Sequence, residues 1–134
     1  IITHLKALGK EAVFLKDKER FCLVPIPLKT GRLKWRGFNQ AEMIARLLSL
    51  YYGLESVSGL KKILKTGPQV KLSRAERRKN IKGSFRCSCP EKIRGRDIIL
   101  VDDVSTTGAT LKEAARVLKK NKAGKIYGLV AAKG

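Results

Sequence analysis

Acidic residues are scarce in this sequence of 134 residues. Eleven Asp and Glu stand against thirty Lys and Arg, so the formal net charge at neutral pH is +19. An excess of positive charge on this scale favours partners that carry phosphate, such as nucleotides, pyrophosphate or nucleic acid, or an anionic lipid surface. The alternative is a basic surface that serves only solubility. The places where the few acids stand are therefore informative.

Histidine and cysteine are nearly absent as well. His4 is the only histidine, which argues against a Ser–His–Asp or Cys–His catalytic device and excludes a metal site built from several histidines. Cys22 lies in an apolar run and is expected in the core. Cys87 and Cys89 are spaced C-x-C, whereas a zinc site needs four ligands and usually shows C-x2-C pairs. Free thiols in a reducing compartment are the favoured interpretation.

The sequence also lacks long apolar runs and common nucleotide-binding loops. No run approaches the roughly 20 residues of a membrane span, and the first residues show no apolar signal core. Both observations favour the cytoplasm. The chain begins at Ile1 rather than at Met, which is compatible with a fragment of a longer protein. Neither a G-x-G-x-x-G loop nor a Walker loop is present.

Hydrophobic periodicity predicts alternating strands and helices. Continuous apolar runs predict buried strands, at 21–28, 98–101 and 126–132, and less regular runs predict further strands, at 54–64 and 85–87. Helical spacing predicts helices, at 1–13, 38–52 (ending at Gly53) and 107–121 (ending at Gly124). Residues 65–84 form a long, polar and basic connection. The alternation predicts a single α/β domain over residues 1–134, with a mostly parallel central sheet flanked by helices.

The stretch IILVDDVSTTGAT, residues 98–110, places two acids directly after an apolar strand. In open α/β sheets, ligands bind outside the carboxyl ends of the strands. The segment after the acids opens a helix, whose first N–H groups are unpaired and whose dipole adds positive charge. Gly108 allows a close backbone approach. With the hydroxyls of Ser105, Thr106, Thr107 and Thr110, this segment is a predicted cradle for a phosphate monoester.

Asp102 and Asp103 suit a different task. Carboxylates repel phosphate but accept hydrogen bonds from vicinal hydroxyls such as a ribose diol, and they can hold Mg²⁺ through its waters. A diol-binding pair beside a phosphate cradle describes a ribose 5-phosphate site. Adjacent strand residues point to opposite faces, so the two acids need not share a role. The alternative is a simple helix N-cap at Thr106 or Thr107, which requires neither two acids nor a glycine.

The same stretch resembles the ribose-phosphate signature of type I phosphoribosyltransferases. The likeness continues through LVPIPLKTGRLKWRGFNQAEMIARLL, TGPQ and LSRAERRKNIKGSF, which in this order are similar to the ComF (competence protein) family. These blocks cover most of residues 22–132. The resemblance implies the type I phosphoribosyltransferase fold with a long flexible loop. It also implies binding of 5-phosphoribosyl 1-diphosphate with Mg²⁺, from which a nitrogen nucleophile displaces pyrophosphate at C1 of the ribose.

The resemblance further implies roles for individual residues. Asp102 and Asp103 would be the catalytic acids that take the ribose hydroxyls, with Mg²⁺ held near them through waters and not by direct side-chain ligation. The 5-phosphate would lie on Ser105, Thr106, Thr107, Gly108, Ala109 and Thr110. The pyrophosphate would lie at the loop after the first strand, on Pro27, Leu28, Lys29, Arg32 and Arg36. The flexible loop would close with the cations Lys71, Arg74, Arg77 and Arg78.

Several alternatives stay open at this point. The basic loop could be a solvated surface. Arg36, Asn39 and Gln40 could bind ligand or brace the start of the helix, whereas Phe38 fits packing better. The cysteine-rich zinc module at the N-terminus of many ComF proteins is not present in this chain, and no segment has a base-reading pattern, so the acceptor is not named.

Three functions are compatible with the sequence. The first is an enzyme that transfers a phosphoribosyl group to a nitrogen acceptor and acts in competence. The second is a non-catalytic factor for DNA uptake or processing, with single-stranded DNA on its basic face. Only Trp35 and Phe85 interleave the cations, which argues against sequence-independent strand binding. The third is a regulator that senses phosphoribosyl diphosphate.

Overall fold

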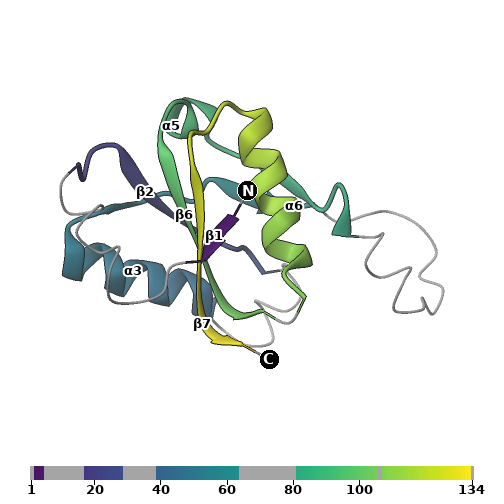
Figure 1. Ribbon diagram of the computed structural model, residues 1–134, viewed down its shortest axis with the longest axis horizontal. Helices are drawn as coiled ribbons and strands as arrows, with labels where there is room; N and C mark the ends of the chain where they lie inside the picture. Colours follow the sequence, from purple (N-terminus) through teal and green to yellow (C-terminus); the bar gives the residue numbers. More distant parts are fainter. Residues whose placement is uncertain (1, 5–16, 29–38, 64–80, 106, 134) are drawn as a thin grey trace.

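The computed structural model describes residues 2–4, 17–28, 39–63, 81–105 and 107–133 (Figure 1). Its strands are β1 (Ile2–His4), β2 (Phe21–Pro25), β3 (Glu55–Ser56), β4 (Leu60–Lys62), β5 (Phe85–Cys87), β6 (Asp97–Ser105) and β7 (Ile126–Lys133). Its helices are α3 (Gln40–Tyr52), α5 (Pro90–Ile93) and α6 (Ala109–Lys120).

The main sheet is parallel throughout the described residues, with strand order β1-β7-β6-β2-β3. In the centre, β2 pairs with β6 from Phe21↔Asp97 to Pro25↔Val101. On its other side β6 pairs with β7, beginning at Ile98↔Ile126. The strands predicted from the continuous apolar runs are thereby confirmed, because a central parallel strand is covered on both faces and needs apolar residues at every position.

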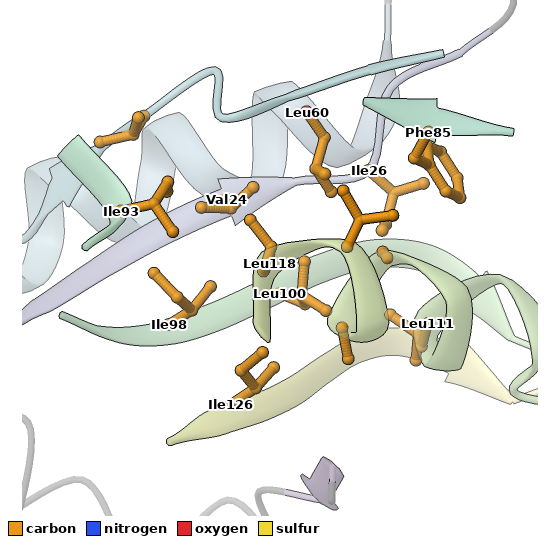
Figure 2. Close-up of a cluster of buried hydrophobic side chains, with 14 of the residues drawn as sticks. Val24, Ile26, Leu60, Phe85, Ile93, Ile98, Leu100, Leu111, Leu118 and Ile126 are labelled. Atoms are coloured by element: carbon orange, nitrogen blue, oxygen red, sulfur yellow. The ribbon is translucent and has the colours of Figure 1, made fainter. Parts of the chain in front are cut away.

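The two faces of the sheet bury separate clusters of apolar side chains. Cys22 and Val24 of β2 and Ile98 and Leu100 of β6 belong to the larger cluster, which also includes Leu111 and Leu118 of α6 (Figure 2). The alternate residues Phe21, Leu23, Ile99 and Val101 join Ala45 of α3 in the smaller cluster. Helices α3 and α6 therefore cover opposite faces (Figure 1), and each residue of β6 is assigned to a face by its position in the alternation.

Helix α3 begins and ends where its sequence provides caps. The Asn39 side chain accepts a hydrogen bond from Ala41 N at 3.0 Å, and Gly53 takes the left-handed conformation (φ 68°) that ends the helix. Both are standard capping devices, and the predicted helix over 38–52 is confirmed. One flank of α3 stays exposed, with Met43, Leu47, Leu50 and Tyr51 between 50% and 82% accessible.

The helix predicted over 107–121 is confirmed as α6, which begins two residues later than predicted and has its C-cap at Asn121. Its last residue is Lys120, and the chain turns through Asn121 and Lys122, whose φ is 65°. The prediction that Gly124 ends the helix is wrong. Gly124 is needed for packing, because a Cβ there would overlap Asp97 Oδ1 and lie 3.2 Å from Arg96 O.

The strand predicted over 54–64 is split between two sheets. Residues 55–56 form β3 at the edge of the main sheet, whereas β4 pairs with β5 in a separate antiparallel ribbon. Gly59 lies between β3 and β4, where the chain passes from one sheet to the other. Glycine permits this passage because a Cβ there would come within 2.9 Å of Ile93 Cδ1. The predicted strand at 85–87 is confirmed as β5. Most of the connection predicted over 65–84 lies outside the described residues.

The helix predicted over 1–13 is wrong at its start. Residues 2–4 form β1, which pairs in parallel with β7 from Ile2↔Ile126 to His4↔Gly128. A segment of three residues takes its conformation from the neighbouring strand rather than from its own periodicity. The short helix α5 was not predicted, because four residues are too few to show a helical period.

Candidate functional site

The candidate site lies where β2 stops and β6 continues. The last hydrogen bond between them runs from Ile26 N to Val101 O at 2.9 Å. Beyond it β6 pairs only with β7 in the described residues, through Asp102↔Val130, Val104↔Ala132 and Ser105↔Lys133. The acids were predicted to follow the strand at 98–101, but they are part of it. One edge of their backbone therefore faces away from β7 at the carboxyl end of the sheet, where ligands of such folds bind.

The two acids differ in their surroundings. Asp102 has the same parity as Ile98 and Leu100 and so lies on the α6 face, where it is 9% exposed. Asp103 has the opposite parity and is half-buried. Each carboxylate accepts the N–H of the following residue at 2.9 Å, Asp102 Oδ1 from Asp103 and Asp103 Oδ1 from Val104. The strand thus holds both side chains close to its own backbone.

Burial raises the pKa of Asp102 from 3.8 to about 7, and the hydrogen bond with the Asp103 side chain adds to the increase. The hydrogen bond from the Asp103 N–H lowers this pKa, the nearby Asp103 charge raises it, and the ammonium of Lys62 makes a smaller contribution that lowers it. Without ligand, Asp102 therefore exchanges its proton near neutral pH. A group of this kind responds strongly to any ligand that prefers one of its two protonation states.

The predicted phosphate cradle is the turn between β6 and α6. Gly108 takes a left-handed conformation (φ 77°), no side chain caps the helix at this residue, and a Cβ there would meet nothing within 4 Å. Ala109 N donates to Thr107 Oγ1 at 3.3 Å, which closes a local turn, but the N-cap of α6 is Gly108, so the alternative of an N-cap at Thr107 is wrong. Thr107 is exposed, and Ala109 and Thr110 are half-buried. The helix thus presents its N-terminus at the end of β6 that carries the acids, and the described residues leave the position of a Gly108 side chain open.

The other predicted site residues are only partly described. Pro27 and Leu28 are half-buried and follow β2, which neighbours β6. For Ser105 the backbone is described, as part of β6. The remaining predicted residues lie outside the described residues: Lys29, Arg32 and Arg36 of the pyrophosphate loop, Thr106 of the cradle, and Lys71, Arg74, Arg77 and Arg78 of the basic loop.

Asn39 has the structural role that was one of its two interpretations. Besides capping α3, its Nδ2 donates to Ile26 O at 3.1 Å. The amide therefore ties the start of α3 to the residue that follows β2. Gln40 is exposed at the first position of the helix.

Two charged residues near the site were missed. Lys62 lies on the ribbon, with its Nζ 5.6 Å from the centre of the Phe85 ring. Glu113 lies on the apolar face of α6, where its Oε1 accepts the Gly83 N–H at 2.9 Å and Arg116 donates to both of its oxygens. The Arg116 hydrogen bond lowers the pKa of Glu113. In both cases a charged residue stands where the period of the strand or helix predicts an apolar one. This mismatch in the sequence could have drawn attention to Lys62 and Glu113.

The described residues contain no cluster of three or more His, Cys, Asp or Glu side chains that could hold a metal ion directly. Among the same residues, no helix has the length and apolar character needed to cross a membrane. Cys22, Cys87 and Cys89 are free thiols, and burial raises the pKa of Cys22 to about 11.

Comparison with known proteins identifies the family. A family model described as "Phosphoribosyl transferase domain" matches residues 36–132. The chain belongs to this family. It is 35% identical over 100 residues to "Competence protein F" of Haemophilus influenzae, covering 73% of this chain and 44% of that protein. It is 37% identical over 114 residues to "Competence protein ComFC" of Bacillus subtilis, covering 81% of this chain and 42% of that protein.

A further relative carries a name that refers to DNA. The chain is 35% identical over 105 residues to the "DNA utilization protein YhgH" of Escherichia coli K12, covering 78% of this chain and 45% of that protein. These relatives assign the chain to the ComF family within the phosphoribosyltransferase superfamily and confirm the resemblance found in the sequence. The chain spans less than half the length of the curated relatives it matches.

A solved structure supports the fold. The "structure of the allosteric regulatory enzyme of purine biosynthesis" superposes with a TM-score of 0.57 at 16% identity, covering 91% of this chain and 25% of that chain. Together with the parallel sheet between α3 and α6, this confirms the expected type I phosphoribosyltransferase fold.

Proposed function

We propose that the chain binds 5-phosphoribosyl 1-diphosphate together with Mg²⁺ at the carboxyl end of β6, and that it transfers the phosphoribosyl group to a nitrogen acceptor. One observation carries the proposal: in a phosphoribosyl transferase domain, an acid pair whose first member is buried is followed, after a short turn, by a helix N-terminus that no side chain caps. A carboxylate pair suits a diol and a helix N-terminus suits a phosphate. Their adjacency therefore suits a sugar that carries both groups.

In this proposal the acid pair and the turn that follows it bind different parts of the ligand. Asp102 and Asp103 accept hydrogen bonds from the ribose hydroxyls, and the turn from Ser105 to Thr110 takes the 5-phosphate. Hydroxyl binding by the ionised carboxylates favours loss of the Asp102 proton, since an ionised carboxylate is acceptor-only. Ligand binding is therefore accompanied by proton release when the free protein is near neutral pH.

The acid pair also fits Mg²⁺ held through water. Asp103 is half-buried, and Mg²⁺ usually keeps several of its waters, which would donate hydrogen bonds to the carboxylates. When bound, the ion neutralises negative charge on the diphosphate. The acids then serve as second-layer acceptors for its waters, and this role is compatible with their task on the hydroxyls.

The proposed reaction needs no nucleophile from the protein. The lone pair of the acceptor nitrogen forms the new bond to C1 of the ribose, and the C1–O bond to the diphosphate breaks with its electrons leaving on pyrophosphate. The protein contributes position and charge. Pro27 and Leu28 would receive the pyrophosphate with the loop cations Lys29, Arg32 and Arg36. The cations of the long basic loop, Lys71, Arg74, Arg77 and Arg78, would close over it and exclude water.

Thermal shift and calorimetry with 5-phosphoribosyl 1-diphosphate and Mg²⁺ test the site. We expect binding by the wild-type chain and none by the double variant Asp102→Asn with Asp103→Asn. Glu91→Gln is the matched control, because it removes an exposed carboxylate on α5 and should leave binding intact. Failure of the wild type to bind at millimolar ligand would contradict the proposal. Pyrophosphate release across a panel of nucleobases then tests transfer. If no nucleobase causes release, the chain binds the ligand but does not transfer the phosphoribosyl group to a nucleobase.

The names of the relatives support a role in competence and DNA utilisation. A second candidate function, binding of single-stranded DNA on the basic surface, is favoured by these names together with the net charge of +19. Its test is the slope of affinity against salt concentration, because neutralised phosphates release counterions. Charge reversal at Lys71, Arg74 and Arg78 should flatten the slope. An unchanged slope would show that the basic loop does not contact phosphate.

A further inference from the structure

The β4–β5 ribbon turns one lysine toward the protein interior. Leu60 and Phe85 lie on the face of the ribbon that packs on the main core and are 6% and 4% exposed. Lys61 is exposed on the opposite face. Because side chains alternate along a strand, Lys62 shares the inner face with Leu60, and it is half-buried. An ammonium group on an inward face loses hydration, and the contact with the Phe85 ring offsets part of this loss.

The environment of Lys62 is the site end of the sheet. Lys62 is paired with Phe85 in the ribbon, and its Nζ lies 5.6 Å from the Phe85 ring centre. Phe85 belongs to the core cluster that contains Ile26 and Leu111, and Figure 2 shows it beside Ile26. Ile26 is the first residue after β2, and Leu111 lies in the first turn of α6. Through Phe85, Lys62 is therefore next to the part of the core that lies under the end of β2.

Asp102 lies on the same face of the sheet as this ribbon. Its parity in β6 matches Ile98 and Leu100, which share the core cluster with Leu60 and Phe85. In agreement with this placement, the Lys62 ammonium lowers the pKa of Asp102 against the effect of burial. The lysine and Asp102 therefore lie on one face of the sheet and interact electrostatically.

The ribbon is fastened to the helix that carries the phosphate cradle. Ile63 N donates to Ser84 O at 2.7 Å, which extends the ribbon by one residue. Gly83 N then donates to Glu113 of α6, and Arg116 holds Glu113 in place. The Glu113 side chain is buried, whereas Gly83 is exposed and Arg116 is half-buried. The position of Lys62 is consequently fixed relative to the N-terminus of α6.

We propose that Lys62 is a ligand-contacting cation whose ammonium binds the diphosphate of 5-phosphoribosyl 1-diphosphate. This inference rests on the proposed function. The 5-phosphate already has the uncapped helix N-terminus, whereas the diphosphate on C1 stands next to the hydroxyl on C2, which the acid pair would bind. Two carboxylates repel a diphosphate at that place, and a fixed cation beside them offsets the repulsion. Lys62 is the described residue with the position and charge for this task.

The test compares three variants by calorimetry in Mg²⁺ buffer. Lys62→Gln removes the charge, Lys62→Arg keeps it, and Lys61→Gln removes the neighbouring charge on the outer face. The ligands are 5-phosphoribosyl 1-diphosphate, pyrophosphate and ribose 5-phosphate. For Lys62→Gln we expect a loss of about 10- to 100-fold for the two diphosphates, the range of a charge-assisted hydrogen bond, and a change under about 3-fold for ribose 5-phosphate. Lys61→Gln should bind all three like the wild type, and Lys62→Arg should recover most of the loss.

Each other outcome overturns the inference in a recognisable way. If Lys62→Gln melts at a lower temperature but binds all three ligands normally, the lysine only packs on Phe85. If it loses all three ligands equally, it positions the site as a whole and does not select the diphosphate. If Lys62→Gln and Lys62→Arg both bind all three ligands like the wild type, Lys62 has no role in binding, while the proposed function stands. If the wild type binds none of the ligands, the proposed function fails, and the inference fails with it.

Discussion

Replacement of Asp102 by Asn is expected to stabilise the ligand-free protein, and to do so more strongly as the pH rises. Burial raises the pKa of this carboxyl from 3.8 to about 7. Between these values the unfolded chain has released the proton and the folded protein still holds it, so folding stability falls with increasing pH. Above about pH 7 the Asp102 carboxyl is ionised in both the folded and the unfolded state, and folding stability falls no further on its account. Asn cannot ionise, and its Oδ1 can still accept the Asp103 N–H.

The expected size follows from linkage. The full difference between the two pKa values corresponds to an upper bound of about 4 kcal/mol at pH 8. Solvent near the half-buried Asp103 and relaxation of the charged form reduce this to about 2 kcal/mol at pH 8 and to less than about 1 kcal/mol at pH 5. For a domain of this length, the gain at pH 8 is an increase of about 6 to 8 °C in melting temperature.

The assay is thermal unfolding without ligand or Mg²⁺ at several values between pH 5 and pH 8. Asp97→Asn is the matched control, because Asp97 is a second buried acid in β6 but is bound by Arg20 Nε at 3.0 Å and by Lys125 N at 2.9 Å. The same substitution there breaks an ion pair and should lower the melting temperature. An Asp102→Asn protein that melts no higher than the wild type at pH 8, or whose gain does not grow with pH, would refute the reasoning.

Three further outcomes are expected. Affinity for 5-phosphoribosyl 1-diphosphate with Mg²⁺ should tighten as the pH rises through about 7, measured by calorimetry, and Asp102→Asn should lack the component of this change that the carboxyl contributes. Gly108→Ala and Gly95→Ala should each lower stability by about 1 kcal/mol, because both glycines have positive φ with open space around them; only Gly108→Ala, at the cradle, should weaken ribose 5-phosphate binding. Gly124→Ala should lower stability by about 2 kcal/mol in denaturant titration, since its Cβ would overlap Asp97, and should leave affinity unchanged.

The local sequence predicted those strands and helices in which buried residues recur at a regular spacing. The runs around Leu23 and Leu100 predicted parallel central strands, because a strand covered on both faces leaves no polar positions. The stripe along α6 predicted its inner face, and Asn39 and Gly53 marked the limits of α3. These features depend on residues that are neighbours along the chain or one helical turn apart.

Features that depend on distant contacts were not predictable in this way. The conformation of β1 comes from β7, and the division of residues 54–64 between two sheets depends on the approach of Gly59 to Ile93. Gly124 looked like a helix stop, yet it is required by Asp97, which is 27 positions earlier in the sequence.

The candidate site shows the same division. The acid pair and the helix start were predicted from one contiguous motif. The burial of Asp102 and the raised pKa that follows were not, because they depend on the layer packed over the strand. The inward direction of Lys62 and the anchoring of Gly83 by Glu113 come from elements that are far apart in the sequence.

The two ends of β6 differ in how firmly they are held. At the amino end, Arg20 binds Asp97 and Arg96 binds Glu55, both at 3.0 Å, and Gly124 packs closely against the strand. At the carboxyl end, β6 has lost β2 as a neighbour and carries an acid whose ionisation opposes folding. Backbone amides near Ile98 should therefore exchange with solvent deuterium mainly through global unfolding, whereas those near Val104 exchange through smaller local openings. If exchange follows this pattern, local opening is concentrated at the end of β6 where the proposed ligand would suppress it.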